Sequence, residues 1–268
     1  MCSKIAADME AFGLTNACLY KSLTVDTSGI DTSPPPHPAM LALVPPEIKS
    51  IFFAGGMSRG ADALPTFTSE ECKEFYEKNI CGTDERRFDI FKNSRGQFAN
   101  PNLVWIDERK NRVSASTARK IAFARSESKA VEYFGGSAFD GDNLRYGRET
   151  EPEAKAEYAA DHDTIVHEPG LVICRHFPWL AASPDGIVVT PEGELIVLEV
   201  KCPVAGQSKI IKPGNLSFLK NNQLKKGDAY YSQVQIQLMA CDAKMCHFYI
   251  YGKKNQILIP IPRDDDFI

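Results

Sequence analysis

The segment that restricts the fold most is "SPDGIVVTPEGELIVLEVKCP", residues 183 to 203. Two runs rich in β-branched residues, "IVV" and "LIVLEV", flank "TPEGE", whose Pro and Gly favour a turn. The simplest structure is a β-hairpin whose turn centres on Glu192. In that register the numbers of facing residues sum to 384, so Asp185 faces Glu199.

Three charges in this hairpin, Asp185, Glu199 and Lys201, need an explanation. Facing residues have Cβ atoms about 4.5–5.5 Å apart, so two carboxylates there repel each other unless a cation lies between them. Lys201 points to the same face as Glu199, because strand side chains alternate. A divalent cation bridged by the two acids would satisfy all three charges. The ordinary alternative is an Asp-Gly turn, with Glu199 and Lys201 reaching water.

Two predicted helices supply further polar side chains. "DNLRYGRETEPEAKAEYAA", read as a helix from about Asn143, places Glu151 on one face with Leu144, Ala154 and Tyr158. A carboxylate on that inner face needs a compensating charge, which a metal ion would supply. "DAYYSQVQIQLMAC" is predicted to be helical as well. Its apolar face is formed by Val234, Leu238 and Cys241, and its polar stripe by Tyr230, Gln233 and Gln237.

The charge of the chain is uneven. The net charge is −4 and the isoelectric point about 5.8, so the overall charge does not indicate a polyanionic partner. Residues 109–129, however, hold seven basic residues against one acid, and residues 201–227 hold six lysines and no acid. Such segments are typical of local phosphate-binding surfaces, although solvated helix faces would have the same composition.

Cysteine use and hydropathy bear on the compartment. The eight cysteines include no CxxC pair, so we expect mostly buried free thiols in an intracellular, reducing compartment, with a structural metal at "CDAKMCH" as the lesser alternative. No signal peptide or membrane-spanning run is evident, so we expect no membrane partner.

Two unequal regions are predicted. Residues 1–65 form an N-terminal extension or adaptor, with the rigid "TSPPPHP" and a helix opened by Pro45 and Pro46. Residues 66–268 form the main domain, beginning with a helix in which Thr68 and Glu71 have capping-box spacing.

Five motifs, "WIDERKNRVSAS", "YGRETEPEA", "SPDG", "LEVKCP" and "YYSQVQ", follow one another in an order that resembles the phage lambda exonuclease or YqaJ-type viral recombinase family. This family is a branch of the PD-(D/E)xK nucleases. The resemblance covers about residues 105–250. It implies an α/β fold, with a mixed central β-sheet flanked by helices, and an N-terminal extension beside it.

The implied activity is a Mg²⁺-dependent deoxyribonuclease, with Mn²⁺ able to substitute. It would digest linear double-stranded DNA from a 5′ end and release 5′-phosphorylated nucleotides during recombination, repair or the processing of viral or mobile DNA. A PD-(D/E)xK endonuclease or nickase, and a catalytically inactive DNA-binding module, remain as alternatives. The implied partners are DNA ends, a single-strand annealing protein and further copies of the chain in a ring trimer. The location would be nuclear in a eukaryotic or viral setting and cytoplasmic otherwise.

The resemblance also implies roles for individual residues. The metal ligands would be Asp185, Glu199 and Glu151, with Lys201 as the catalytic lysine and Gln233 near the attacking water. The pocket for a terminal 5′-phosphate would be formed by Arg109, Ser116, Ser183 and, more loosely, Arg125.

Overall fold

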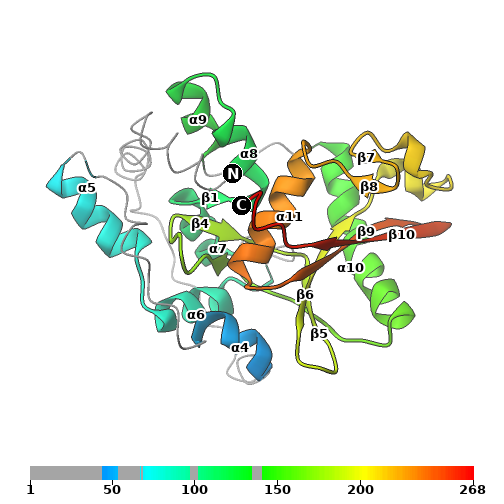
Figure 1. The fold of residues 1–268 in the computed structure, drawn as a ribbon, viewed down its shortest axis with the longest axis horizontal. Coiled ribbons are helices and arrows are strands. Elements are labelled where there is room, and N and C mark those ends of the chain that lie inside the picture. The colour runs from blue at the N-terminus through cyan, green and yellow to red at the C-terminus, as the bar shows by residue number, and fades with distance from the viewer. Residues whose placement is uncertain (1–43, 54–66, 68, 97–101, 135–140) are drawn as a thin grey trace.

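A computed structural model describes residues 44–53, 67, 69–96, 102–134 and 141–268. Its centre is a five-stranded sheet in the order β10-β9-β6-β5-β2 (Figure 1). The strands are β2 (Val166–His167), β5 (Gly186–Val189), β6 (Leu195–Lys201), β9 (Met245–Gly252) and β10 (Asn255–Pro262). Only the β6–β9 pair is parallel within this sheet, so the expected mixed α/β architecture is confirmed.

Two smaller sheets accompany the central one. A three-stranded sheet has the order β1-β4-β3, formed by β1 (Val113–Ser114), β3 (Val172–Ile173) and β4 (Leu180–Ala182). A hairpin of β7 (Leu219–Lys220) and β8 (Gln223–Leu224) lies within the lysine-rich segment.

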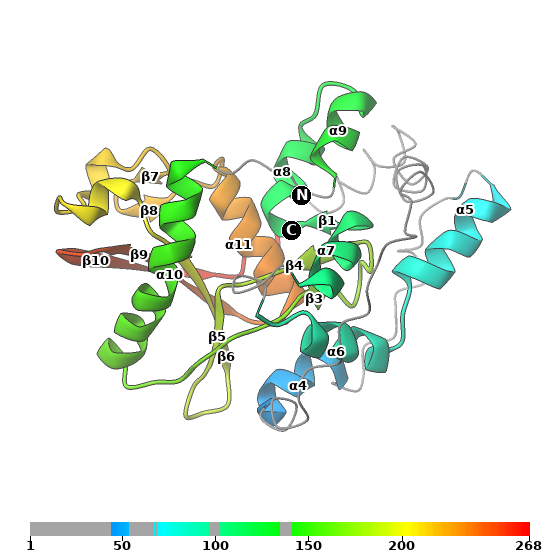
Figure 2. The same ribbon diagram turned by 180° about the vertical axis from the view of Figure 1, so that it is seen from behind.

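Two helices cover opposite faces of the central sheet. Helix α11 (Ala229–Ala240) lies on the face turned to the viewer in Figure 1, and α10 (Asp142–Asp161) lies on the face seen in Figure 2. The alternation of strand side chains explains this arrangement. Odd-numbered Val197 belongs to the core that includes α11, whereas even-numbered Leu198 packs with Ala154 and Tyr158 of α10.

The remaining helices precede α10 in the chain or lie between β6 and β7. The α-helices are α4 (Pro46–Phe53), α5 (Glu70–Phe75), α6 (Asp84–Asn93), α7 (Leu103–Lys110), α8 (Ala115–Ala122) and α9 (Glu127–Tyr133). A π-helix, η2 (Tyr76–Ile80), continues α5, and two short 3-10 helices are η3 (Val204–Gln207) and η4 (Pro213–Asn215).

The predicted hairpin register is confirmed. Ile187 pairs with Val197 and Gly186 with Leu198, and both pairs of numbers sum to 384. The turn closes through Gly193 N, which donates to Thr190 O at 2.9 Å, and Gly193 has a φ of +81° that suits glycine. Asp185 and Glu199 therefore stand at facing positions.

The predicted inner face of α10 is only partly correct. Ala154 and Tyr158 are buried and Glu151 is half-buried, as expected, but Leu144 is 50% exposed. The sheet contacts of α10 explain the difference, since the helix packs on β2 and β6 through its second half.

The first helix of the main domain begins one residue later than predicted. Ser69 caps α5, its Oγ accepting from Cys72 N at 3.2 Å. Thr68, the predicted cap, lies outside the described residues.

The proposed boundary near residue 65 stays a prediction, because residues 1–43, with the "TSPPPHP" segment, and 54–66 lie outside the described part of the chain. Within that region, α4 begins at Pro46, as the proline pair predicts. It buries Ile48, Ile51 and Phe52 in the main core.

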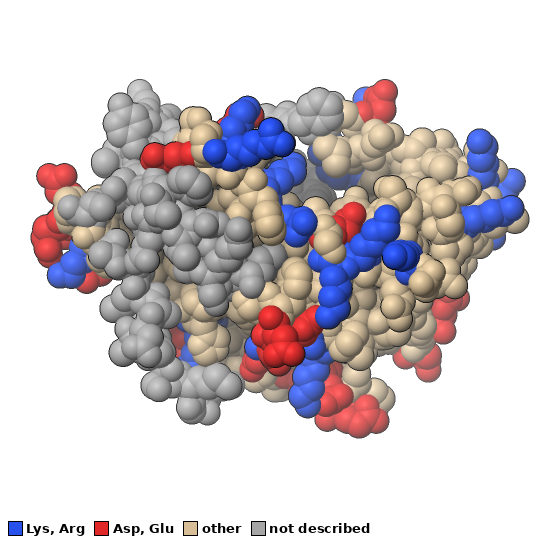
Figure 3. All heavy atoms as spheres, turned by 45° about the horizontal axis from the view of Figure 1, so that its top comes forward, with Lys and Arg blue, Asp and Glu red and all other residues tan. Residues whose placement is uncertain are grey.

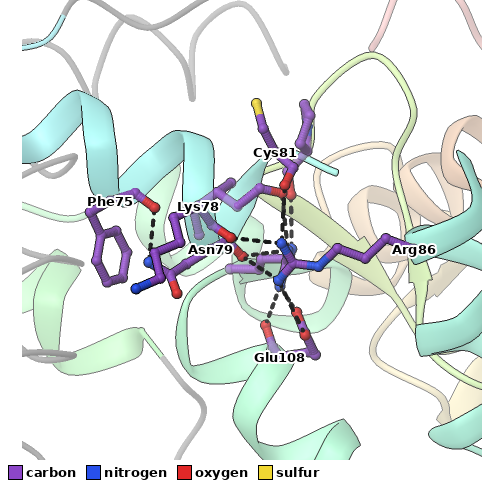
Figure 4. Close-up of polar contacts among 9 residues, drawn as sticks. Phe75, Lys78, Asn79, Cys81, Arg86 and Glu108 are labelled. Carbon is purple, nitrogen blue, oxygen red and sulfur yellow. Dashed lines mark hydrogen bonds and ion pairs between the residues drawn. The ribbon is translucent and has the colours of Figure 1, made fainter. Parts of the chain in front are cut away.

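Two arginines join η2 to the rest of the fold. Arg86 and Arg112 donate to the carbonyl groups at the end of η2 over 2.7 to 3.3 Å, and Glu108 pairs with both arginines. These carbonyls belong to Lys78, Asn79, Ile80 and Cys81. Figure 4 shows Arg86 between Glu108 and the carbonyl groups of Lys78, Asn79 and Cys81. Arg112 is only 1% exposed, so it is a structural arginine and not part of a phosphate-binding surface, contrary to its place in the basic run.

Cys174, Cys241 and Cys246 are free and buried. Among the described helices, none is both long and apolar enough to span a membrane.

Candidate active site

The start of β5 and the end of β6 bring two carboxylates together. Asp185 N donates to Leu198 O at 3.1 Å, and Asp185 Oδ2 accepts from Val200 N at 2.7 Å. Both bonds tie Asp185 to β6, the strand that carries Glu199. Burial and the nearby Glu199 carboxylate raise the pKa of Asp185 well above its usual value. Asp185 is thus costly to ionise while no cation separates the two acids.

Glu199 is 1% exposed, and its carboxylate accepts hydrogen bonds from three side chains. Its Oε1 accepts from Gln233 Nε2 at 2.6 Å and from Lys201 Nζ. Its Oε2 accepts from Gln237 Nε2 at 2.6 Å. A buried carboxylate is tolerated only with such partners, so α11 is fixed against β6 by its two glutamines.

Lys201 stays positively charged in this setting. Burial lowers the pKa of the Lys201 ammonium, but the carboxylates of Glu199 and Asp185 outweigh burial and leave that pKa raised. Its Nζ also lies 4.9 Å from the ring centroid of Tyr230, a contact that favours a cation. The polar stripe predicted for α11, Tyr230, Gln233 and Gln237, therefore faces the Glu199–Lys201 pair.

Glu151 reaches the same charges from α10. Its pKa is raised by burial and by Glu199, although Lys155 and Lys201 oppose the shift. Lys155 Nζ lies 2.9 Å from Glu151 Oε1 and donates to the Asp185 carbonyl at 3.2 Å. Glu151 Oε1 is thus buried, with the Lys155 ammonium as its described partner.

The fit of these acids to a metal ion can be judged from their oxygen atoms. No group of three His, Cys, Asp or Glu side chains in the described part of the chain stands close enough to form a ready-made metal site. The carboxylates nevertheless suit a hard divalent cation, which prefers oxygen ligands. Burial and neighbouring carboxylates raise the pKa values of both Asp185 and Glu151, which marks a place where a cation would be stabilising.

A second cluster surrounds Arg109 on α7. Its Cζ lies 4.0 Å from the ring centroid of Trp105, one helical turn earlier, and its Nη2 donates to Ser114 Oγ at 3.2 Å. Burial lowers the pKa of Arg109 to about 10. No acid among the described residues forms an ion pair with it, so its charge is available for an external anion.

The Ser114 hydroxyl and the Trp105 indole connect Arg109 to two of the other predicted phosphate ligands. Ser114 Oγ lies 3.2 Å from Ser116 Oγ, and Trp105 Nε1 donates to Ser183 Oγ at 3.0 Å. Arg109, Ser116 and Ser183 are thus members of one connected polar cluster. Ser183 precedes Asp185 by two residues, which places this cluster beside the carboxylates.

Arg125 is not part of that cluster. It follows α8, is exposed, and lines a separate cavity with Arg119, Lys120 and Lys129. In the described part of the chain no hydrogen bond or ion pair links Arg125 to Arg109, Ser116 or Ser183. Its predicted role in the phosphate pocket has no geometric support, because the end of α8 carries it to a different surface.

Residues 104–244, which include every residue of both clusters, match the family described as the YqaJ-like viral recombinase domain. The chain belongs to this family. The YqaJ-like domain thus contains the hairpin, α10 and α11, and its first matched helix is α7 with Arg109.

Two viral proteins are similar to this YqaJ-like chain. The alkaline nuclease of Orgyia pseudotsugata multicapsid polyhedrosis virus is 26% identical over 201 residues, which cover 65% of the chain and 45% of that protein. The alkaline nuclease of Autographa californica nuclear polyhedrosis virus is 30% identical over 107 residues, covering 32% and 26%. The chain thus spans less than half the length of these curated relatives.

Two solved structures are also similar to the chain. The alkaline exonuclease LHK-Exo from Laribacter hongkongensis is 24% identical with a TM-score of 0.48, covering 60% of this chain and 82% of that one. LHK-Exo in complex with dAMP has a TM-score of 0.49 at the same identity, covering 61% and 83%.

Several contributing residues of the YqaJ-like domain were missed from the sequence. Gln237 was placed on the polar stripe but given no role, although it holds Glu199 Oε2. Lys155 stands four residues after Glu151, a spacing that predicts an ion pair on a helix. Trp105 stands four residues before Arg109 in the same way. Ser114 links the cluster through the fold, and no sequence signal distinguishes it from its neighbours.

Proposed function

We propose that this YqaJ-like chain is a Mg²⁺-dependent deoxyribonuclease that digests linear duplex DNA from a 5′ end. The observation that carries the proposal is the facing pair of Asp185 and Glu199, with Lys201 bound to Glu199 Oε1. Two viral proteins similar to the chain are named alkaline nucleases, which supports a nuclease.

The acids would hold the metal. Asp185, Glu199 and Glu151 would be its protein ligands, and Mn²⁺ would substitute for Mg²⁺ since both prefer oxygen donors. The metal would lower the pKa of bound water and stabilise negative charge on the leaving 3′ oxygen. Glu199 Oε1 already accepts two hydrogen bonds, so binding a metal through that oxygen would displace Lys201 Nζ or Gln233 Nε2.

Lys201 would then act on the scissile phosphate. Its charge, maintained by the surrounding carboxylates, would attract the phosphate oxygens and screen the negative charge that develops during attack. Gln233 can donate to or accept from the attacking water without adding charge. Cleavage of the 3′ O–P bond would leave a 5′-phosphate and a 3′-hydroxyl.

The Arg109 cluster would select the 5′ end of the DNA strand. A guanidinium without an acidic partner among the described residues, in one polar cluster with the hydroxyls of Ser114, Ser116 and Ser183, is chemically suited to a terminal phosphate. Because Ser183 lies two residues from Asp185, a phosphate held there would align the next phosphodiester with the carboxylates. The substrate would therefore be a 5′-phosphorylated strand.

Recombination, repair or viral DNA processing, a single-strand annealing partner, a ring trimer and a nuclear or cytoplasmic location remain part of this proposal. They rest on the family and not on a contact within the chain.

The test is digestion of linear duplex labelled at its 3′ ends, with closed circular duplex of equal length beside it. We expect progressive shortening of the linear duplex in Mg²⁺, none in EDTA, and none of the circle. Equal attack on the circle would favour an endonuclease. Binding of both duplexes with cleavage of neither, in any divalent metal, would favour an inactive DNA-binding module.

A further inference from the structure

A separate basic cavity lies between α8, α9 and the first residue of α11. Its volume is about 570 Å³, and six of its lining residues are basic or aromatic: Arg119, Lys120, Phe123, Arg125, Lys129 and Tyr133. The remaining described lining residues are Ala124 and Ala229. Figure 3 shows the side of the molecule that carries α8 and α9, where basic side chains gather at the upper centre beside a hollow.

The positive charge of this cavity is largely uncompensated. Lys129 pairs with Glu132 at 2.6 Å, and both side chains are exposed. Arg119, Lys120 and Arg125 form no ion pair with any described acid. A concave surface with this charge attracts an anionic chain such as a nucleic-acid backbone.

An exposed aromatic ring distinguishes the cavity from an ordinary basic surface. Phe123, the C-cap residue of α8, is 55% exposed, and Arg119 Cζ lies 4.5 Å from its ring centroid. Tyr133, with Lys120 Nζ at 5.9 Å, forms part of the same wall. Aromatic rings beside cations are the usual means of holding unpaired bases, which stack on them while the cations follow the phosphates.

The size of the cavity also favours a single strand. A volume of this order accommodates a drug-sized molecule, comparable to one or two nucleotides, and is too small for a duplex. In a duplex the faces of the bases are stacked on one another and are not available to Phe123. The ligand class is therefore unpaired nucleic acid.

The position of the cavity indicates which strand it would take. Ala229 lines the cavity, and the next residue, Tyr230, contacts Lys201. Arg119 lies one helical turn beyond Ser116 on α8. The cavity thus adjoins both clusters of the proposed active site but shares no lining residue with either. Since those clusters would hold the digested strand, the cavity is left for the complementary one.

We propose that this cavity is a binding subsite for unpaired DNA, occupied by the 3′-ended strand that digestion of its complement exposes. The assignment of that strand rests on the proposed function. Phe123 would stack on a base, and Arg119, Lys120 and Arg125 would contact phosphates. The subsite would hold the end of the duplex open and keep the two strands apart.

The test is equilibrium binding of the full chain in EDTA, measured by fluorescence anisotropy at one fixed salt concentration. Three duplexes of equal length are compared: blunt, with a 3′ overhang of about ten thymidines, and with a 5′ overhang of the same size. The wild type should bind the 3′-overhang duplex most tightly. Phe123→Ala should weaken that complex roughly five-fold or more and leave the blunt complex nearly unchanged.

Matched variants separate stacking from other effects. Phe123→Tyr should retain the affinity and Phe123→Leu should lose it, because only the first keeps an aromatic face. Phe53→Ala removes another exposed phenylalanine, 43% exposed on α4, and should change nothing. Arg125→Ala alters an exposed side chain with no described partner, so it tests the subsite even if a change at Phe123 disturbs α8. It should weaken the 3′-overhang complex selectively.

The subsite would be overturned if the variants lost affinity equally for all three duplexes. It would also be overturned if neither Phe123→Ala nor Arg125→Ala lost affinity for the 3′-overhang duplex. A selective loss on the 5′-overhang duplex would also overturn it, since the occupant would then be the digested strand. Because EDTA removes the metal, binding is separate from cleavage. If the wild type cuts no DNA while Phe123→Ala and Arg125→Ala still selectively weaken the 3′-overhang complex, the result would contradict the proposed function and support a subsite for unpaired DNA.

Discussion

At the scale of single residues, Lys201 has the clearest expected effect. Lys201→Met keeps the length and the apolar stem of the side chain but removes the ammonium that binds Glu199 Oε1. We expect cleavage to fall roughly 10²-fold or more, in the range typical of a positioned acid–base group, with duplex binding little changed. Single-turnover rates in Mg²⁺ measure this effect.

Lys209→Met is the matched control, since Lys209 is exposed in the same lysine-rich segment. A Lys201→Met rate close to that of Lys209→Met would remove Lys201 from the proposed chemistry.

Asp185 offers a stability test in the absence of metal. Because its pKa is raised in the folded chain, the folded state binds more protons than the unfolded state, and stability falls as pH rises through that window. Asp185→Asn removes this cost and can still accept from Val200 N. We expect a melting temperature a few degrees higher at pH 8 in EDTA, since about 1 kcal/mol corresponds to about 2–4 °C for a chain of this size.

The sign of the Asp185→Asn effect depends on conditions. The gain should disappear below about pH 4, where the carboxyl group is protonated in both states. Added Mg²⁺ should stabilise the wild type and not the variant. An Asp185→Asn chain that melts below the wild type at pH 8 in EDTA would mean that Asp185 is stabilised by cations already within the fold.

At the scale of secondary-structure elements, Gly186 decides how the hairpin fits the sheet. A Cβ at Gly186 would lie 2.5 Å from Val166 Cγ1 on β2 and 3.3 Å from Leu198 Cδ2 on β6. We expect Gly186→Ala to destabilise the chain by about 1–3 kcal/mol through overpacking and to impair cleavage by displacing Asp185. Urea unfolding and initial digestion rates measure the two effects.

Val166→Ala provides the control for Gly186, because it removes the methyl group that the new Cβ would meet. The double variant Gly186→Ala with Val166→Ala should recover part of the lost stability relative to the sum of the single changes. Strictly additive losses would show that the strain lies elsewhere.

The hairpin was predictable from sequence because its register follows from a short turn and the two-residue period of strands, and both are local. The same applies to the polar stripe of α11. The predictions that failed depend on contacts between segments that are distant in the sequence. Leu144 was placed inside because helical spacing cannot show where α10 leaves the sheet. Arg112 was counted with the surface cations, yet its partners Asn79 and Ile80 stand more than 30 residues away.

The Arg109 cluster was predictable from the sequence only in part. Its members come from α7, from the β1–α8 junction and from the segment before β5. The family resemblance supplied Arg109, Ser116 and Ser183 but not Ser114 or Trp105, which connect them. Packing places Trp105 Nε1 against Ser183, 78 residues away, and no pattern in either segment contains that information.

At the scale of the whole molecule, the two clusters together predict a preference among DNA ends. Linear duplex with a 5′-phosphate should be digested faster than the same duplex with a 5′-hydroxyl, because the terminal phosphate would bind Arg109 and align the next linkage with Asp185 and Glu199. A charge-assisted contact contributes about 1.5–3 kcal/mol, so the preference should be roughly ten-fold or more where the contact forms mainly in the transition state.

Arg109→Ala should reduce this preference towards one while leaving digestion of the 5′-hydroxyl duplex almost unchanged. The specific expectation follows from geometry: Arg109 has no acidic partner among the described residues and stacks on Trp105, so its removal leaves no buried acid uncompensated. If Arg109 only attracted the DNA backbone in general, its loss would slow both substrates by the same factor. Lys110→Ala, next to Arg109 but exposed and paired with Asp107, is the control for that general attraction. Initial rates on the two ends at one salt concentration separate the two cases, and equal wild-type rates on both ends would contradict the phosphate pocket.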